Sequence, residues 1–170
     1  MIPMSCYNKF DSNMRNWTLR RANSQDALAL ALCVEAAYHP HLSQVGRLAS
    51  TSEAQYIELI ALYQVWVAVY QGEIIGGLVL IPKEAHMLLA NIVVRPEHQG
   101  KGVGQALLEL ADNEAFGQSY QEIHLCTNID MTKNIDMYRR SGWIEMQSGM
   151  QEGHRIYMRK VLQPHGKSRR

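Results

Sequence analysis

The chain contains little cysteine and no cysteine pattern. Its 170 residues include three widely separated cysteines, Cys6, Cys33 and Cys126, with no Cys-x-x-Cys pair. An odd, scattered set does not build a disulfide framework, so we interpret them as reduced thiols of a cytosolic protein. The seven histidines also lack a metal-ligand spacing, since their nearest pair, His39 and His41, fits a solvated loop better than a metal site. We therefore expect no metal.

The chain also lacks an excess of charge and a long apolar run. Seventeen basic and sixteen acidic residues give a formal net charge of +1, which offers no electrostatic case for a nucleic acid or an anionic membrane. No apolar run approaches membrane-spanning length, and the first sixteen residues lack a signal-peptide core. We expect a cytoplasmic protein that binds neither nucleic acid nor membranes. The sequence leaves open whether it forms a homodimer.

A substantial apolar core is present, because 46% of the residues are hydrophobic. This length and composition fit one domain, which we place at 17–162. Residues 1–16 show no sustained period and are predicted to form a loose arm. The basic stretch 163–170 is predicted to be a disordered tail.

Alternation and capping signals predict the elements of this domain. A first strand is expected at 17–22, a helix opened by Ser24 up to about residue 38, and a second helix opened by Thr51 or Ser52. A hairpin follows at 65–70 and 74–81, where Gly76-Gly77 predicts a bulge or a close backbone approach. The remaining strands and helices are expected at 87–94, 103–116, 121–127, 132–141, 143–147 and 155–161.

This order places antiparallel hairpins around one strand-helix-strand crossover. We therefore predict an α/β (α+β) fold. Its central sheet should be mixed, mostly antiparallel and six- to seven-stranded, with helices on both faces.

The most informative segment is the strand-turn-helix at 92–108. The strand ending Ile92-Val93-Val94 runs into a proline-stopped turn, and three alternating glycines, Gly100, Gly102 and Gly104, precede the helix. Backbone N–H groups without side-chain cover at the start of a helix suit a phosphate or pyrophosphate. The preceding strand can hold the rest of an extended ligand by main-chain hydrogen bonds.

Other phosphate-binding patterns fit this turn less well. A P-loop needs Ser or Thr after Gly-Lys, whereas Lys101 is followed by Gly102 and Val103. A dinucleotide fold needs Gly-x-Gly-x-x-Gly and an acidic residue at the end of the next strand, but the nearest candidate, Glu122, lies at that strand's start. A glycine-rich turn without a ligand would cost backbone entropy with no packing return.

The segment resembles the acetyl-CoA signature of the GNAT superfamily of N-acetyltransferases, Gln/Arg-x-x-Gly-x-Gly/Ala, at Gln99, Gly102 and Gly104. The resemblance covers roughly residues 17–162. Its other matches, which include the later signature of one large bacterial branch, are Ala36-Ala37-Tyr38, Gly76-Gly77-Leu78-Val79, Thr127-Asn128, Met131, Asn134, Tyr138 and Gly142-Trp143.

The resemblance implies a GNAT-like acyl-CoA N-acyltransferase fold, in which the strands ending at Val94 and Thr127 splay apart and admit the pantetheine arm of acetyl-CoA. It implies main-chain contacts from Ile92, Val93 and Val94 to the pantetheine amides. Asn128 and Asn134 either contact this arm or form local caps. The pyrophosphate contacts are implied for Gln99, Gly100, Lys101, Gly102, Val103, Gly104 and Gln105, although Lys101 fits a solvated lysine equally well.

Tyr138 is the predicted catalytic acid, because it stands four residues before Gly142, where the family keeps that group. A phenol is protonated at neutral pH and can donate its proton to a leaving thiolate. The alternative is a purely structural role, as a buried aromatic residue on a short helix. The general base is less defined, since Ala90 occupies the position of a glutamate in many relatives. His86 is the leading candidate, and a water relay or an already neutral amine would also serve.

Two functions follow from these residues. The first is acetyl transfer from acetyl-CoA to a primary amine of a small molecule or peptide, by direct attack in a ternary complex with Tyr138 as acid. The second is a non-catalytic acyl-CoA sensor or interaction module on the same fold, for which the missing carboxylate at Ala90 is the support.

Overall fold

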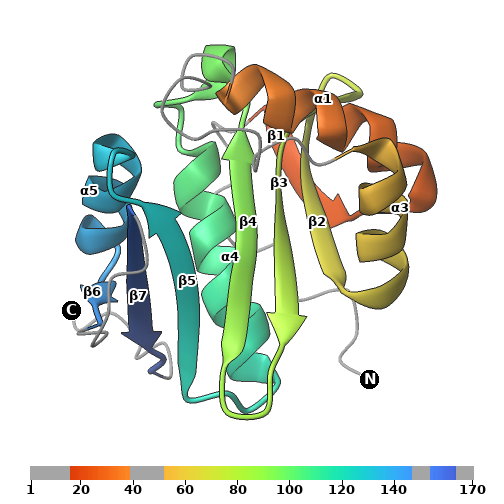
Figure 1. Ribbon diagram of the computed structural model, residues 1–170. Helices are drawn as coiled ribbons and strands as arrows, with labels where there is room; N and C mark the ends of the chain where they lie inside the picture. The colour runs from red at the N-terminus through yellow and green to blue at the C-terminus, as the bar shows by residue number, and fades with distance from the viewer. Residues whose placement is uncertain (1–15, 39–51, 147–153, 164–170) are drawn as a thin grey trace, which may run out of the picture.

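The computed structural model describes residues 16–38, 52–146 and 154–163. These residues form one seven-stranded sheet in the order β1-β2-β3-β4-β5-β7-β6 (Figure 1). Only β4 and β5 run parallel, and every other neighbouring pair is antiparallel. The strands are β1 Trp17–Arg21, β2 Gln64–Tyr70, β3 Glu73–Pro82, β4 Met87–Val94, β5 Glu122–Asn128, β6 Ile144–Glu145 and β7 Arg155–Val161.

Helices cover both faces of this sheet. The α-helices are α1 Ala27–Tyr38, α3 Glu53–Leu62, α4 Val103–Gly117 and α5 Thr132–Arg140, with short 3₁₀ turns η2 Ser24–Asp26 and η5 Pro96–His98. In Figure 1, α1 and α3 lie on the viewer's side and α4 lies behind the sheet. Two buried clusters reflect this division, one under α1 and α3 and one under α4. The predicted fold class, mixed sheet and element order are confirmed.

Capping side chains set the helix starts. Ser52, one of the two predicted caps, is the N-cap of α3 and forms a reciprocal capping box with Gln55. The prediction that Ser24 opens the first helix is wrong, because Asn23 is the cap and forms the box with Asp26 around η2. Asp26 also receives two hydrogen bonds from Arg20, at 2.7 and 2.9 Å, so this capping carboxylate ties β1 to the helix entrance.

The glycine pair in β3 marks both a bulge and a close approach. A Cβ on Gly76 would lie 2.7 Å from the Val93 carbonyl oxygen, and one on Gly77 would lie 2.6 Å from Leu30. The register of β2 and β3 also shifts by one residue beside this pair, at Ile75. The prediction at these positions is confirmed.

The parallel strands β4 and β5 pair over only part of their length. Their ladder joins Met87–Leu89 to Ile123–Leu125 and stops there, although β4 continues to Val94 and β5 to Asn128. The register between β4 and β3 shifts at the same level, which makes Ala90 an extra residue in β4. The sheet therefore opens between β4 and β5, as the family resemblance implied.

The final hairpin begins one residue later than predicted. Of the strand expected at 143–147, Trp143 is buried in the core, Ile144–Glu145 pair with β7, the Met146 amide donates to the Tyr157 carbonyl at 2.8 Å, and residue 147 lies outside the described residues. The arm and the tail lie almost wholly outside the described residues. No helix in the described part of the chain is long and apolar enough to cross a membrane.

Candidate functional site

A cavity of about 770 Å³ lies where β4 and β5 separate. Its wall comes from the end of α1, the last residues of β4, the glycine turn, and the loop into α5. The lining residues are Ala37, Tyr38, Ile92, Val93, Val94, Gln99, Gly100, Gly102, Gly104, Gln105, Asp130, Met131, Thr132, Lys133, Asn134, Met137, Tyr138 and Arg140.

The glycine turn presents bare backbone at the start of α4. Gly100 and Gly102 adopt the left-handed conformation, with φ of +74° and +84°, which strains any residue with a side chain. Gly102 is the N-cap of α4, so no side chain caps the helix. Gly104 follows one position into the helix, where a Cβ would lie 3.4 Å from the Met137 sulfur. The first amides of α4 thus keep their hydrogen-bonding capacity for an anion.

The turn is fastened to the sheet by hydrogen bonds on its strand side. The Arg95 amide donates to the Ile75 carbonyl at 2.8 Å, and Arg95 Nε donates to the Ile74 carbonyl at 3.0 Å. Gln99 Nε2 donates to the Val94 carbonyl at 3.0 Å, which folds the turn back over the end of β4. These bonds hold the glycine amides in place before any ligand binds.

Tyr138 lies on α5 and lines the same cavity. Its side chain is only 4% exposed, and its ring packs against Trp143 with a centroid separation of 6.0 Å. Burial, and secondarily the nearby Tyr38, raises the pKa of Tyr138, so the phenol keeps its proton at neutral pH. Ser141 Oγ donates to Gln105 Oε1 at 3.0 Å, which joins the end of α5 to the first turn of α4.

The structure brings most of the predicted coenzyme residues together. Those that line the cavity with Tyr138 are Ile92, Val93, Val94, Gln99, Gly100, Gly102, Gly104, Gln105 and Asn134. Three others do not line it. Lys101 is exposed on the turn, and Val103 is buried in the core at 1% exposure. The Asn128 side chain accepts from the Asp130 amide at 2.8 Å, so it shapes the loop that enters the cavity wall.

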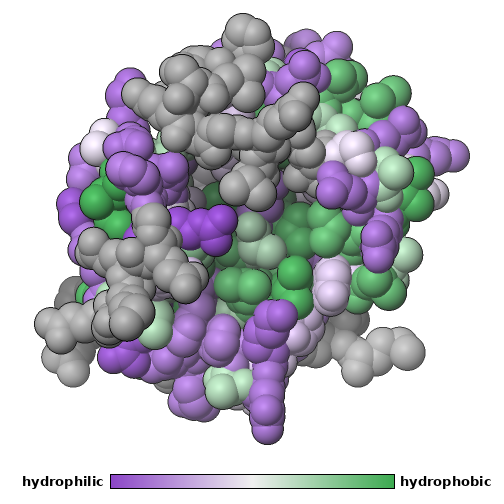
Figure 2. Space-filling model, viewed as in Figure 1, coloured by the Kyte–Doolittle hydropathy of each residue, from purple (hydrophilic) through white to green (hydrophobic). Residues whose placement is uncertain are grey.

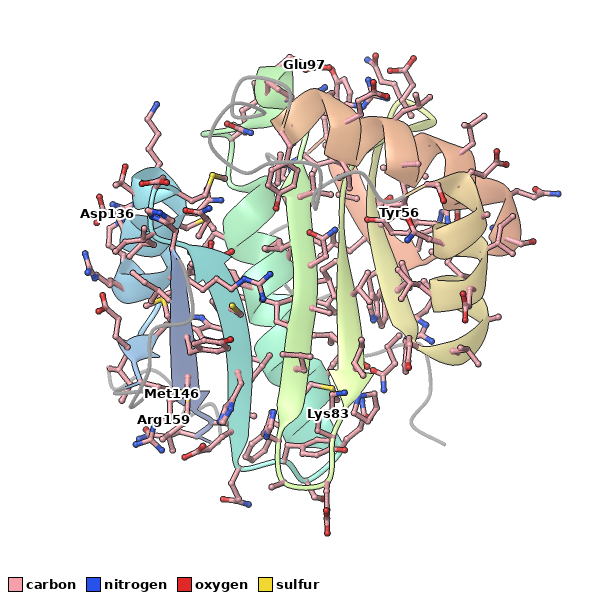
Figure 3. The ribbon with its side chains drawn as sticks, viewed as in Figure 1. Tyr56, Lys83, Glu97, Asp136, Met146 and Arg159 are labelled. Carbon is pink, nitrogen blue, oxygen red and sulfur yellow. The ribbon has the colours of Figure 1, made fainter. Side chains whose placement is uncertain are left out.

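His86 does not meet this cavity. It immediately precedes β4, whose seven residue steps to Val94 span about 23 Å. The His86 carbonyl accepts from the Lys83 amide. Figure 3 labels Lys83 at one end of the sheet and Glu97, which lies just before the glycine turn, at the other. The His86 ring stacks on His124 with centroids 3.9 Å apart, and burial lowers its pKa, with His124 as a second cause. This position does not support His86 as a base for a group bound in the cavity.

Sequence reasoning missed the loop wall of the cavity. Asp130, Thr132, Lys133 and Met137 were not proposed as binding residues, although all four line it. Asn128 followed by Asp130 at an asparagine-led turn was the available signal, because such a turn redirects the chain after a strand. Ala37 and Tyr38 approach from α1 across the sheet, and no local pattern encodes that contact. Among the described residues, no group of three or more His, Cys, Asp or Glu could hold a metal ion.

Comparisons with known proteins bear on the family and the fold. A mycothiol acetyltransferase of Jonesia denitrificans is 34% identical over 76 residues, which are 43% of this chain and 24% of that protein, so the chain spans about a quarter of that relative. Among solved structures, a PaiA N-acetyltransferase of Thermoplasma acidophilum in complex with coenzyme A superposes with a TM-score of 0.78. It has 15% identity and covers 86% of this chain and 99% of that one.

The ribosomal-protein-S18-alanine N-acetyltransferase of Escherichia coli superposes with a TM-score of 0.71 and 18% identity, over 91% of this chain and 99% of that one. At these identities the superpositions show the fold. The family model "Acetyltransferase (GNAT) family" matches residues 33–143, which include β4, the glycine turn, α4 and Tyr138. On this match, the chain belongs to the acetyltransferase (GNAT) family.

Proposed function

We propose that this protein transfers an acetyl group from acetyl-CoA to a primary amine of a small molecule or peptide, by direct attack in a ternary complex. One observation carries the proposal. The bare amides at the start of α4, the open edge of β4 and the buried phenol of Tyr138 all border one cavity. Direct transfer from a pantetheine thioester needs an anion site, a strand edge that can hydrogen-bond the pantetheine arm, and a proton donor.

The cavity residues fit the coenzyme. The pyrophosphate would rest on the amides from Gly100 to Gln105, where any larger residue at Gly102 would be strained. The pantetheine amides would pair with main-chain groups of Ile92–Val94, because β5 leaves that edge of β4 unpaired. Lys133 and Arg140 also line the cavity and would add positive charge toward the phosphates.

The transfer requires one bond to form and one to break. The neutral amine nitrogen attacks the thioester carbonyl carbon, the carbon–sulfur bond breaks, and the thiolate takes the phenolic proton of Tyr138. The amine then loses its extra proton to water, and Tyr138 is reprotonated from solvent. Because the phenol is buried, its pKa is raised and it holds its proton at neutral pH.

Asp130 is the one carboxylate among the described residues that line the cavity, and it is exposed on the loop that leads into α5; no described histidine lines the cavity. We therefore propose that the amine enters neutral or loses its proton through water. The free thiols Cys33 and Cys126 fit a reducing compartment, and we propose a cytoplasmic location.

Steady-state kinetics on Tyr138→Phe test the acid. General acid catalysis contributes about a hundredfold or more, so we expect kcat to fall by about that factor with little change in KM for acetyl-CoA. Tyr63→Phe is the matched control, because Tyr63 ends α3 and does not line the cavity. A Tyr138→Phe enzyme within about twofold of the wild type would contradict the assignment.

Thiol release across an amine panel, combined with calorimetry for coenzyme A, tests the activity itself. Release with at least one amine supports acetyl transfer. Coenzyme A binding without release for any amine would favour the acyl-CoA sensor, for which Ala90 in place of a carboxylate is the sequence support. Absence of binding at millimolar coenzyme A would overturn both functions.

A further inference from the structure

On the face of the sheet opposite α4, the described helices leave part of β3 and β4 uncovered beside the cavity (Figure 2). Figure 2 shows apolar surface in a hollow over β3 and β4, between α3 and β5. The register of β5 and β7 identifies which side chains share this face. Lys160 pairs with Asp112 of α4 on the far side, so the alternate residues Arg155, Tyr157 and Arg159 face the open side.

The two arginines of β7 on this face differ in their partners. Arg159 binds one oxygen of the Glu122 carboxylate, whose other oxygen lies 2.9 Å from Nε2 of His124. Its charge is therefore neutralised within the sheet. The guanidinium of Arg155 is exposed and has no ion-pair or hydrogen-bond partner among the described residues. Arg155 is thus the β7 cation of this face that remains available to a ligand.

Arg155 also stands at the level of the cavity. The paired part of β4 and β5 ends at Leu89 and Leu125, and Tyr157 lies opposite Cys126, the next residue of β5. Arg155 lies opposite Asn128, which is three residue steps or about 10 Å beyond Leu125 along β5. Asp130, two residues after Asn128, lines the cavity. A molecule on the open face can therefore reach both the parting of the strands and this guanidinium.

We propose that Arg155 binds a carboxylate of the acceptor, so the acceptor class is a small amine that also carries a carboxylate. This inference rests on the proposed function, because it assigns the second substrate of the same site. The amine would point to the parting of the strands near Ala90, its apolar part would lie in the hollow beside Leu88 and Tyr157, and its carboxylate would meet Arg155. A guanidinium forms two parallel hydrogen bonds with a carboxylate and repels a cationic acceptor such as a polyamine.

Matched acid and amide pairs test this assignment. Acetyl transfer to leucine, phenylalanine and β-alanine is compared with transfer to their carboxamides, by thiol release, in the wild type, Arg155→Gln and Arg155→Lys. We expect the wild type to prefer the acid by about tenfold or more in kcat/KM, mainly through KM. The Arg155→Gln variant should lose this preference and the lysine variant should keep part of it. Comparing ratios between variants cancels the difference in amine basicity.

Arg159→Gln is the control, because it removes an arginine of the same strand and face that Glu122 already neutralises. Its acid-to-amide ratio should change less than twofold. The inference is overturned if the wild type does not prefer acids, or if Arg155→Gln keeps the preference. Preference for an aminoalkylphosphonate over the matching acid would assign a phosphate instead of a carboxylate. If neutral amines alone are acetylated, this inference fails while acetyl transfer stands. If no amine releases thiol, the proposed function fails first.

Discussion

The two ends of β4 both lie beside polar groups, but they differ in how many of their backbone hydrogen-bonding groups remain unpaired. At its start, Met87–Leu89 pairs with strands on both sides, and His86 stacks on His124, whose ring contacts Glu122. At its end, Ile92–Val94 has lost its partner on one side and leads into uncapped helix amides. Reactive side chains gather at the first end, whereas unused hydrogen-bonding groups gather at the second. The comparison teaches that free backbone capacity locates the site better than histidine does.

The largest expected effect is a loss of stability, caused by adding a side chain to β3 opposite the second end of β4. Gly76→Ala places a Cβ 2.7 Å from the Val93 carbonyl oxygen, so β3 and β4 must shift apart. Overpacking of this kind costs about 1–3 kcal/mol in the free energy of unfolding. We expect Tm to fall by about 5 °C in thermal unfolding, on a scale of about 2–4 °C per kcal/mol. Gly117→Ala, where nothing lies within 4 Å, should not lower Tm, and equal losses in both variants would refute the close approach.

An intermediate effect is expected from straining the glycine turn. Gly102→Val puts a β-branched residue at φ +84°, which costs about 1–2 kcal/mol unless the turn rearranges. A rearranged turn moves the amides, so calorimetry should show about tenfold weaker binding of coenzyme A. Gly72→Val is a matched control, because Gly72 has the same φ of +84° in the β2–β3 turn. It should lose similar stability and keep its affinity. Equal affinity in both variants would argue against the amides as the phosphate site.

The smallest effect on activity is expected at the first end of β4. His86→Gln should change kcat/KM by less than about twofold, and a hundredfold loss would restore His86 as the base. Its effect on stability depends on pH. The folded pKa of His86 lies below its usual 6.5, so the stability that it contributes is present above pH 6.5 and is lost as pH falls below that value. Between pH 7 and 5, the free energy of unfolding of His86→Gln should therefore fall less steeply than that of the wild type.

The parts of the fold and site that were predicted from sequence are those with local signals. Alternation located the strands, the glycines at 100, 102 and 104 located the turn, and the spacing of Tyr138 before Gly142 placed the phenol that lines the cavity. The parts missed depend on contacts across the molecule. Tyr38 enters the cavity from α1, and the stacking of His86 on His124 follows from strand register, which no short pattern reveals.

Two predicted element boundaries were wrong for a related reason. Asn23 and Ser24 are both good caps, and the reciprocal bond with Asp26 selects Asn23. The strand β6 begins at Ile144 and not at Trp143, because Trp143 is buried in the core beside Tyr138. In both cases a tertiary contact decides between local alternatives of similar energy.

Ala90 is the extra residue of a bulge in β4, at the level where the strand loses β5 as its partner. Before it, Met87 and Leu89 face α4, and after it Ile92 and Val94 do, an interval of three residues in place of two. Deleting this one alanine would restore the regular two-residue interval, so Ile92 and Val94 would still face α4 and Val93 would still face Leu30 and Tyr56, but the bulge would be lost. Ala90 thus supplies the local bend and added twist of a bulge where β4 parts from β5, and its removal should change the course of β4 beside the cavity while leaving the strand's inward and outward side chains as they are.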